Sequence, residues 1–290
     1  MQKKKTAVPT YLGVAAVWIG SHFGPGFATG AFSVRWYVKY GWVGLVTPLL
    51  AMLITGSVMY FMLEYAREHG TPNYRPFARS CYGEKLGGVV AVLYDICFLM
   101  TMMCAGGLAF SGEGKLLQGF LGVNYWATAI ITILISAALC LYGSKLLAKS
   151  SGYLITILLM VCLIFTLFSY TNVFDVCAET LPVMSVLNRL GMKWLQWLYV
   201  ILMTLAVLTS AAGLAHAGNV RFDGLFRFIK PAQLRRFVIT AILLGIAAVG
   251  AALGFQAMLQ QGTSIVGWAA IPIVVIPAFT IVASKVQKAN

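Results

Sequence analysis

Long apolar runs, separated by short polar stretches, dominate the pattern of the chain. Eight of them are long enough to cross a membrane: 11–33, 42–65, 87–111, 124–143, 151–170, 193–215, 236–256 and 264–284. A membrane-crossing helix needs about 20 predominantly apolar residues, and a helix satisfies its own backbone polar groups in lipid. The pattern therefore predicts an all-α polytopic membrane protein with about eight transmembrane helices, forming one transmembrane domain over residues 1–290.

The stretch 171–191 interrupts this pattern. It carries Asp175, Glu179, Pro182 and Arg189, which is too much polarity for the hydrocarbon core. We expect a loop here on the outer side of the membrane.

Composition agrees with a membrane location. Hydrophobic residues make up 60% of the chain and charged residues 10%, against roughly 45–50% and about 25% in soluble domains. This balance excludes a soluble enzyme, a nucleic-acid-binding module and a disordered protein. The sequence contains no catalytic triad, zinc-protease motif, phosphate-binding loop or dinucleotide fingerprint. We therefore expect no enzymatic activity and no cofactor other than a sodium ion.

The net charge of +13 is distributed as membrane topology requires, which argues against a nucleic-acid partner. Lys and Arg concentrate in cytoplasmic loops of membrane proteins. With the amino terminus inside, 16 of the 21 Lys and Arg residues fall on the cytoplasmic side. The outer side receives Arg35, Lys39, Lys115, Arg189 and Lys193. We predict cytoplasmic termini, a first run retained as a span, and a multi-pass protein of the cell membrane.

The first apolar run contains an unusual cluster of helix breakers. Gly20, Gly24, Pro25, Gly26 and Gly30 fall within eleven residues. Proline removes a backbone donor, and each glycine costs about 1 kcal/mol of helix propensity relative to alanine. Freed backbone groups are tolerated in a membrane where they line a cavity or are buried in protein, and broken helices mark transporter binding sites. A simple proline kink or close helix packing is the alternative.

The run from Val17 to Gly30 resembles the first helix of the YkvI-like membrane proteins. That family belongs to the amino acid–polyamine–organocation (APC) superfamily, which has the LeuT-type fold. Its motif reads approximately G-A-G-F-A-[ST]-G and is followed by a polar residue, whereas this chain has Pro25 at the second position and Ala31-Phe32 after the motif. The resemblance implies that the broken segment holds the anionic group of a solute. The substrate-binding residues would be Gly24, Gly26, Phe27, Ala28, Thr29 and Gly30.

A second element is similar to the eighth helix of sodium-coupled LeuT-type transporters. The sixth apolar run contains Ala206, Thr209 and Ser210 in the spacing A-x-x-T-S. The resemblance implies a sodium site formed by the carbonyls of Gly20, Phe23 and Ala206 and the hydroxyls of Thr209 and Ser210. The alternative is that these hydroxyls bond to backbone carbonyls of their own helix, as Ser and Thr often do in membranes.

LeuT-type folds have ten core helices in two inverted repeats, and this chain has about eight. If the sixth run is equivalent to the family's eighth helix, the pair equivalent to its sixth and seventh helices is absent. The loop at 171–191 would stand in their place. The pocket would then be open on one side unless a second copy of the chain or another membrane protein completes it.

Several ionisable residues lie within or beside the apolar runs, and three of them bear on function. Asp95 in the third run is a candidate for proton coupling, with pairing to a neighbour as the alternative. His22 in the broken segment is a second candidate, with a structural role as the alternative. Glu113 lies just beyond the predicted end of the third run, where a solvated or interfacial role suffices.

These features favour a secondary-transporter-like protein that moves a small solute such as an amino acid, with sodium or proton coupling. The alternative is a reduced relative that does not transport and instead serves as a membrane scaffold or partner subunit. The missing helix pair motivates that alternative.

Overall fold

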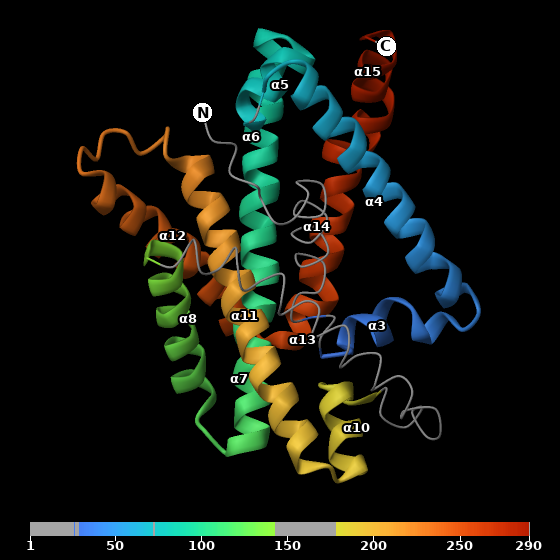
Figure 1. Cartoon of the computed structure of the whole chain (residues 1–290), viewed down its shortest axis with the longest axis vertical. Coiled ribbons are helices and arrows are strands. Elements are labelled where there is room, and N and C mark those ends of the chain that lie inside the picture. Colours follow the sequence, from blue (N-terminus) through green and yellow to red (C-terminus); the bar gives the residue numbers. More distant parts are fainter. Residues whose placement is uncertain (1–25, 27–28, 72, 143–177, 290) are drawn as a thin grey trace, which may run out of the picture.

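The computed structural model describes residues 26, 29–71, 73–142 and 178–289 of the chain. Every regular element in this part of the chain is a helix (Figure 1). In chain order the helices are α3 (Ala31–Trp36), η1 (Val38–Tyr40), α4 (Val43–Glu68), α5 (Tyr74–Tyr82), α6 (Glu84–Thr101), η2 (Met102–Gly106), α7 (Gly107–Leu121), α8 (Tyr125–Tyr142), α10 (Pro182–Leu190), α11 (Lys193–Phe222), α12 (Ala232–Leu253), α13 (Phe255–Ala257), η4 (Met258–Gly262), α14 (Thr263–Ala270), η5 (Ile271–Val275), η6 (Ala278–Val282) and α15 (Ala283–Ala289).

Six helical runs are long and apolar enough to cross a membrane, which confirms the all-α polytopic class. They are Val43–Glu68, Glu84–Leu121, Tyr125–Tyr142, Lys193–Phe222, Ala232–Leu253 and Phe255–Val286. These runs coincide with six of the eight predicted spans. The predicted span 151–170 and most of 11–33 lie outside the described residues. Residues 182–190 form the short helix α10 rather than a span, in agreement with the expected loop.

The surface of α4 shows why this chain needs lipid around it. Val43, Leu45, Leu49 and Leu53 are each between 62% and 67% exposed. A soluble monomer rarely exposes a continuous apolar surface of this kind. Trp42, Trp126 and Trp194 stand at the first turns of α4, α8 and α11, where aromatic residues mark the membrane–water interface.

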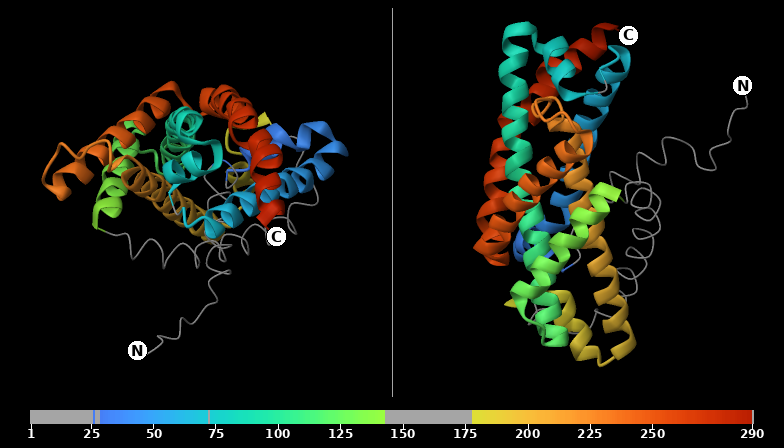
Figure 2. Two further views of the ribbon diagram at one scale, coloured as in Figure 1. Left: turned by 90° about the horizontal axis from the view of Figure 1, so that it is seen from above. Right: turned by 90° about the vertical axis from the view of Figure 1, so that its left-hand side faces the viewer.

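The main core lies where α7, α8, α11 and α12 pack together, seen end-on in Figure 2. Phe110, Met203, Val207 and Leu243 are almost completely buried there. This packing fixes α11, which carries Arg221, against α7, which carries Glu113.

Small residues allow α12 to cross the long helix Glu84–Leu121 at very short range. A Cβ atom added to Gly250 would lie 2.1 Å from the carbonyl oxygen of Met103, and one added to Gly107 would lie 2.7 Å from Gly250. Close backbone approach through small residues is a typical way for membrane helices to associate. The π-helical segment η2 lies at this crossing.

Two helix ends differ from the predicted span boundaries. The third span was expected to end at 111, but the helix runs from Glu84 to Leu121. The seventh and eighth spans were expected to be separated by residues 257–263, but the chain turns at Gly254, whose φ is 94°, and resumes helix at Phe255. Only a residue without a side chain adopts this conformation without strain. In the last helix, Pro272 and Pro277 accompany the π-helical segments η5 and η6, because proline cannot supply the usual backbone hydrogen bond.

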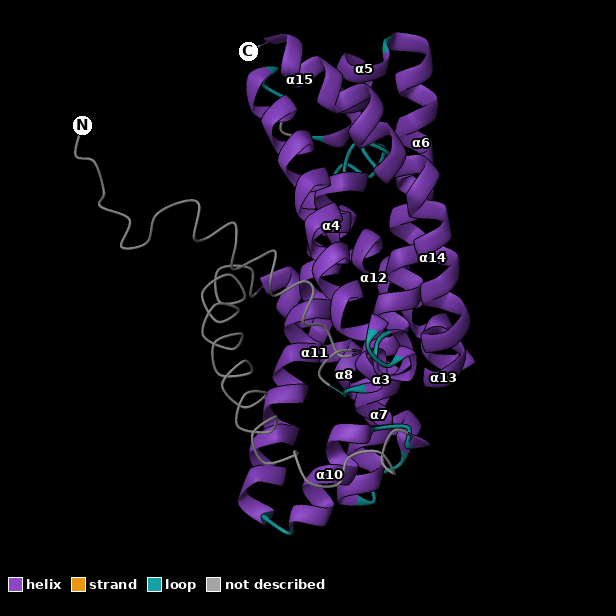
Figure 3. Ribbon diagram, turned by 90° about the vertical axis from the view of Figure 1, so that its right-hand side faces the viewer, coloured by secondary structure: helices purple, strands orange, loops and turns teal. Residues whose placement is uncertain are grey.

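The two ends of the bundle differ. Figure 3 shows α5 and α15 at one end and α10 at the other. At the first end, Lys285 on α15 donates a hydrogen bond to the carbonyl oxygen of Cys81 on α5, 2.5 Å away. Arg221 at the end of α11 reaches the same α5–α6 corner. The charge count assigns all of these residues to the cytoplasmic side.

Candidate functional site

In the described part of the predicted break, Gly30 stands outside helix. Its φ is 78°, in the left-handed region, and α3 begins only at Ala31. The hydroxyl of Thr29 donates to the carbonyl of Gly26, 3.0 Å away, and the carbonyl of Thr29 accepts a 3.2 Å hydrogen bond from the backbone N–H of Val183 on α10. The break is therefore held by the outer loop helix.

The other residues predicted for the solute site, Gly24, Phe27 and Ala28, lie outside the described residues. So do His22 and the two predicted sodium ligands Gly20 and Phe23. The solute site, the sodium site and a role of His22 in proton coupling stay predictions.

On α11 the hydroxyl of Thr209 donates to the carbonyls of Leu205 and Ala206, at 2.9 and 3.1 Å. This is the intrahelical bonding that the sequence left open as the alternative to ion binding. Ser210 is half-buried on the next position. Within the described residues, no group of three or more His, Cys, Asp or Glu side chains could hold a metal ion.

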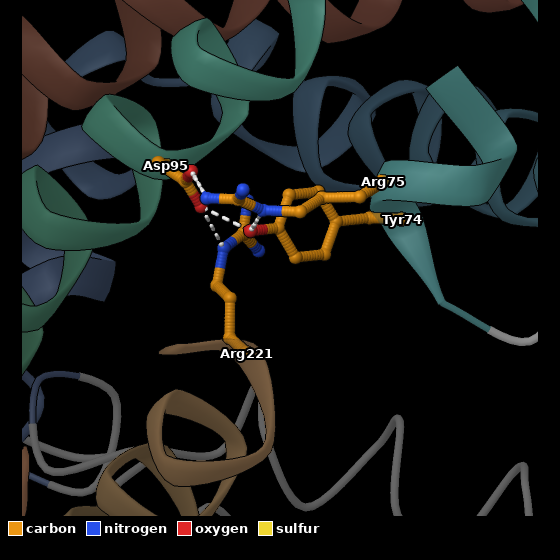
Figure 4. A network of polar contacts seen from close by, with 4 residues as sticks. All are labelled: Tyr74, Arg75, Asp95 and Arg221. Carbon is orange, nitrogen blue, oxygen red and sulfur yellow. Dashed lines mark hydrogen bonds and ion pairs between the residues drawn. The ribbon is translucent and has the colours of Figure 1, made fainter. Parts of the chain in front are cut away.

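Asp95 lies at the centre of a polar cluster that joins three helices (Figure 4). One carboxylate oxygen accepts a hydrogen bond from the Nε of Arg221 on α11, at 2.9 Å, and the other accepts from Arg75 on α5, at 2.8 Å. The hydroxyl of Tyr74 donates to the same oxygen as Arg221. The guanidinium of Arg221 lies 3.6 Å from the centre of the Tyr74 ring.

This arrangement explains how a carboxylate is tolerated at Asp95, which is only 7% exposed. Buried charges are stable where opposite charges and hydrogen bonds satisfy them. Burial, together with the hydrogen bond to Asp95, raises the pKa of the Tyr74 phenol, so Tyr74 remains a donor at neutral pH. Of the two sequence interpretations of Asp95, the structure shows the pairing one.

Glu113 on α7 is the second ionisable group of interest. Its side chain is fully buried, and the hydroxyl of Thr204 on α11 donates to its Oε1 at 2.5 Å. Its Oε2 has no hydrogen-bond partner among the described residues. An ionised carboxylate left unpaired in such a place costs several kcal/mol. A proton or a bound cation would remove that cost.

The solvated role that the sequence allowed for Glu113 is wrong, because the side chain is fully buried. The sequence placed the end of the span at 111, but the helix continues to Leu121 and packs against α11 along this stretch. Ser111, Gly112 and Gly114 surround Glu113 and are themselves buried. Their small size allows close helix packing.

An open pocket of about 430 Å³ lies between the end of α7 and the outer loop. Its lining on α7 begins at Lys115, two residues after Glu113. Polar residues contribute much of its lining: Lys115, Gln118, Glu179, Thr180, Ser185 and Asn188. It lies at the α10 end of the bundle, which the charge count places outside the cell.

The comparisons with known proteins give one weak relationship. The chain is 22% identical over 155 residues to the uncharacterized membrane protein YkvI of Bacillus subtilis (strain 168), which covers 52% of this chain and 42% of that protein. The match therefore spans less than half of the length of that relative. No known family model matches the chain, and no solved structure matches it. The match supports the description of the chain as a YkvI-like membrane protein.

Proposed function

We propose that the chain is a secondary-transporter-like protein that moves a small solute, such as an amino acid, across the cell membrane. In this proposal it is a member of the APC superfamily with a LeuT-type core that lacks one helix pair. Its broken first helix holds the solute at Gly24–Gly30, and the movement is coupled to protons or sodium. The YkvI match and the interruption at Gly30 support this proposal.

The observation that carries the proposal is the carboxyl group of Glu113. Its side chain is fully buried and its Oε2 has no partner among the described residues, and ionisable groups within membrane spans usually mark ion or proton pathways. Asp95 is less suited to coupling, because two arginines and Tyr74 occupy both of its oxygens. We therefore assign proton coupling to Glu113 in place of Asp95.

Coupling at Glu113 would be linked to the predicted sodium residues through α11. Thr204, which bonds to Glu113, precedes Thr209 by five residues on the same helix. At 1.5 Å per residue, the two lie about 7.5 Å apart along the helix axis. A proton lost from Glu113 would strengthen the hydrogen bond that Thr204 donates to its Oε1 and leave a buried negative charge between α7 and α11, close to that site.

Reconstitution tests the proposal. Purified protein is incorporated into liposomes that contain a pH-sensitive dye, and each of the twenty standard amino acids is added outside, with and without sodium. We expect at least one amino acid to acidify the lumen above the rate in protein-free liposomes, or to enter only with sodium. If none enters and none raises the melting temperature of the purified protein, the proposal fails and a scaffold or partner-subunit role is favoured.

A further inference from the structure

A second cavity, of about 410 Å³, opens at the other end of the bundle between α4, α5, α6 and α14. Its walls are mainly apolar, with Met62, Phe77, Phe98 and Val274 among the lining residues. The volume falls in the range of small-molecule sites, about 300–1,000 Å³. Of the residues predicted for the solute or sodium site, those that the structure describes do not line it.

Among the described residues that line this cavity, Arg221 is the one that carries a charge. Its Nε is bonded to Asp95, but its two terminal nitrogens make no hydrogen bond to any described residue. The side chain is 17% exposed. Among the described residues, the guanidinium therefore keeps donors on its two terminal nitrogens that Asp95 does not use.

Aromatic rings hold this guanidinium in place. Its central carbon lies 3.6 Å from the ring centre of Tyr74 and 5.0 Å from that of Phe98, and both residues line the cavity. Such cation–π contacts fix the position of an arginine without using its hydrogen-bond donors. The cluster of Asp95 with Arg75 and Arg221 also carries one negative and two positive charges, so an excess positive charge remains beside the cavity.

We propose that this cavity binds a small organic anion with an apolar body, whose carboxylate or phosphate lies on the terminal nitrogens of Arg221. Two-pronged contact with an oxyanion is the geometry that arginine favours. The apolar body of the ligand would lie against Met62, Phe77 and Val274. A soluble carboxylate and the headgroup of an anionic lipid share this chemistry. The inference does not depend on transport.

Cys97 provides a reporter, because it lines the cavity and is half-buried. Alkylation of Cys97 by a small maleimide is followed by peptide mass spectrometry on the full chain in a neutral detergent. The probe is 4-phenylbutyrate, and 4-phenylbutan-1-ol is the uncharged control. We expect saturable protection by the carboxylate and at least tenfold weaker protection by the alcohol.

Variants distinguish the loss of ligand binding from a loss of folding. We expect Arg221→Gln to raise the half-protecting concentration of 4-phenylbutyrate at least tenfold, and Arg75→Gln, which leaves Arg221 in place, to change it less than threefold. Ala270→Phe fills the cavity without touching the charged cluster and should abolish protection. Ala252→Phe places the same ring on an exposed position of α12 and should not.

Nanodiscs identify the source of the anion. If phosphatidylglycerol discs raise the half-protecting concentration relative to phosphatidylcholine discs, the site takes an anionic lipid headgroup; if the two agree, it takes a soluble anion. Both results support the site. Equal protection by acid and alcohol, or unchanged protection in both Arg221→Gln and Ala270→Phe, would overturn it.

Discussion

Asp95 on α6 and Arg221 on α11 form an ion pair at 2.9 Å, although 126 positions separate them in the chain. The pair joins the start of the long helix Glu84–Leu121 to the end of α11. Arg75 completes the cluster from α5, with 41% of its side chain exposed.

We expect the three charged residues of this cluster to differ in their effect on stability. Asp95→Asn leaves two arginines facing each other without a counter-charge and should cost about 3 kcal/mol. Arg75→Gln removes a largely solvated partner and should cost less than about 1 kcal/mol. Melting temperatures of the purified variants in detergent should fall in the order Arg75→Gln, Arg221→Gln, Asp95→Asn, with Asp95→Asn the lowest. Equal losses for Arg75→Gln and Asp95→Asn would contradict this description of the cluster.

The tyrosines of α5 predict sensitivity to alkaline pH. Burial raises the pKa of the phenols of Tyr82 and Tyr74 above their ordinary value of 10.0. Below pH 10 both phenols are neutral in the folded and the unfolded chain. As pH rises above that value, the unfolded chain ionises first, so the folded state loses stability. The melting temperature should therefore decline above pH 10, and Tyr82→Phe should make the decline shallower. An identical slope in the variant would show that Tyr82 is not responsible.

The crossing of α12 offers a matched pair of glycines. Gly250→Ala places a methyl group 2.1 Å from the carbonyl oxygen of Met103, whereas an added Cβ at Gly245 meets nothing within 4 Å. Overpacking at a close crossing costs about 1–3 kcal/mol. Alanine at the open position gains up to about 1 kcal/mol of helix propensity. Thermal unfolding should show Gly250→Ala less stable and Gly245→Ala as stable as the parent or more so.

The sodium prediction has its own test. Sodium chloride should raise the melting temperature above that in choline chloride, and Thr209→Ala combined with Ser210→Ala should remove this difference. Thr263→Ala is the control, because its hydroxyl also bonds to a carbonyl one turn back, that of Leu259 at 2.7 Å. A full sodium response in the double variant would mean that the hydroxyls of the A-x-x-T-S segment bond only to backbone carbonyls of α11 and do not bind sodium.

The sequence predicted the class of fold well, because the length and apolarity of each run decide whether a helix can cross a membrane. The sequence did not predict the helix ends at two places, because the residues there occur both inside helices and in loops. The third run was predicted to end before Glu113, although the helix continues past it and the small residues beside it allow close packing inside a bundle. The turn at Gly254 leaves no polar stretch in the sequence between the last two spans, because a single residue with positive φ makes the turn without a loop.

The partners of the two carboxylates could not be predicted from local pattern. Thr204 lies 91 positions from Glu113, and only the packing of α7 on α11 brings them together. For Asp95 a signal did exist, since the charge count placed Arg75 and Arg221 on the same side of the membrane. It did not reveal which of the many basic residues on that side would reach the carboxylate.

The most direct test of the account is proton movement through liposomes containing Glu113→Gln, with whichever amino acid the parent protein moves. Glutamine keeps the shape and the bond to Thr204 but cannot release a proton. The account predicts that the variant loses solute-driven acidification of the lumen while it still exchanges labelled for unlabelled solute across the membrane. Acidification at the parental rate would contradict the assignment of coupling to Glu113.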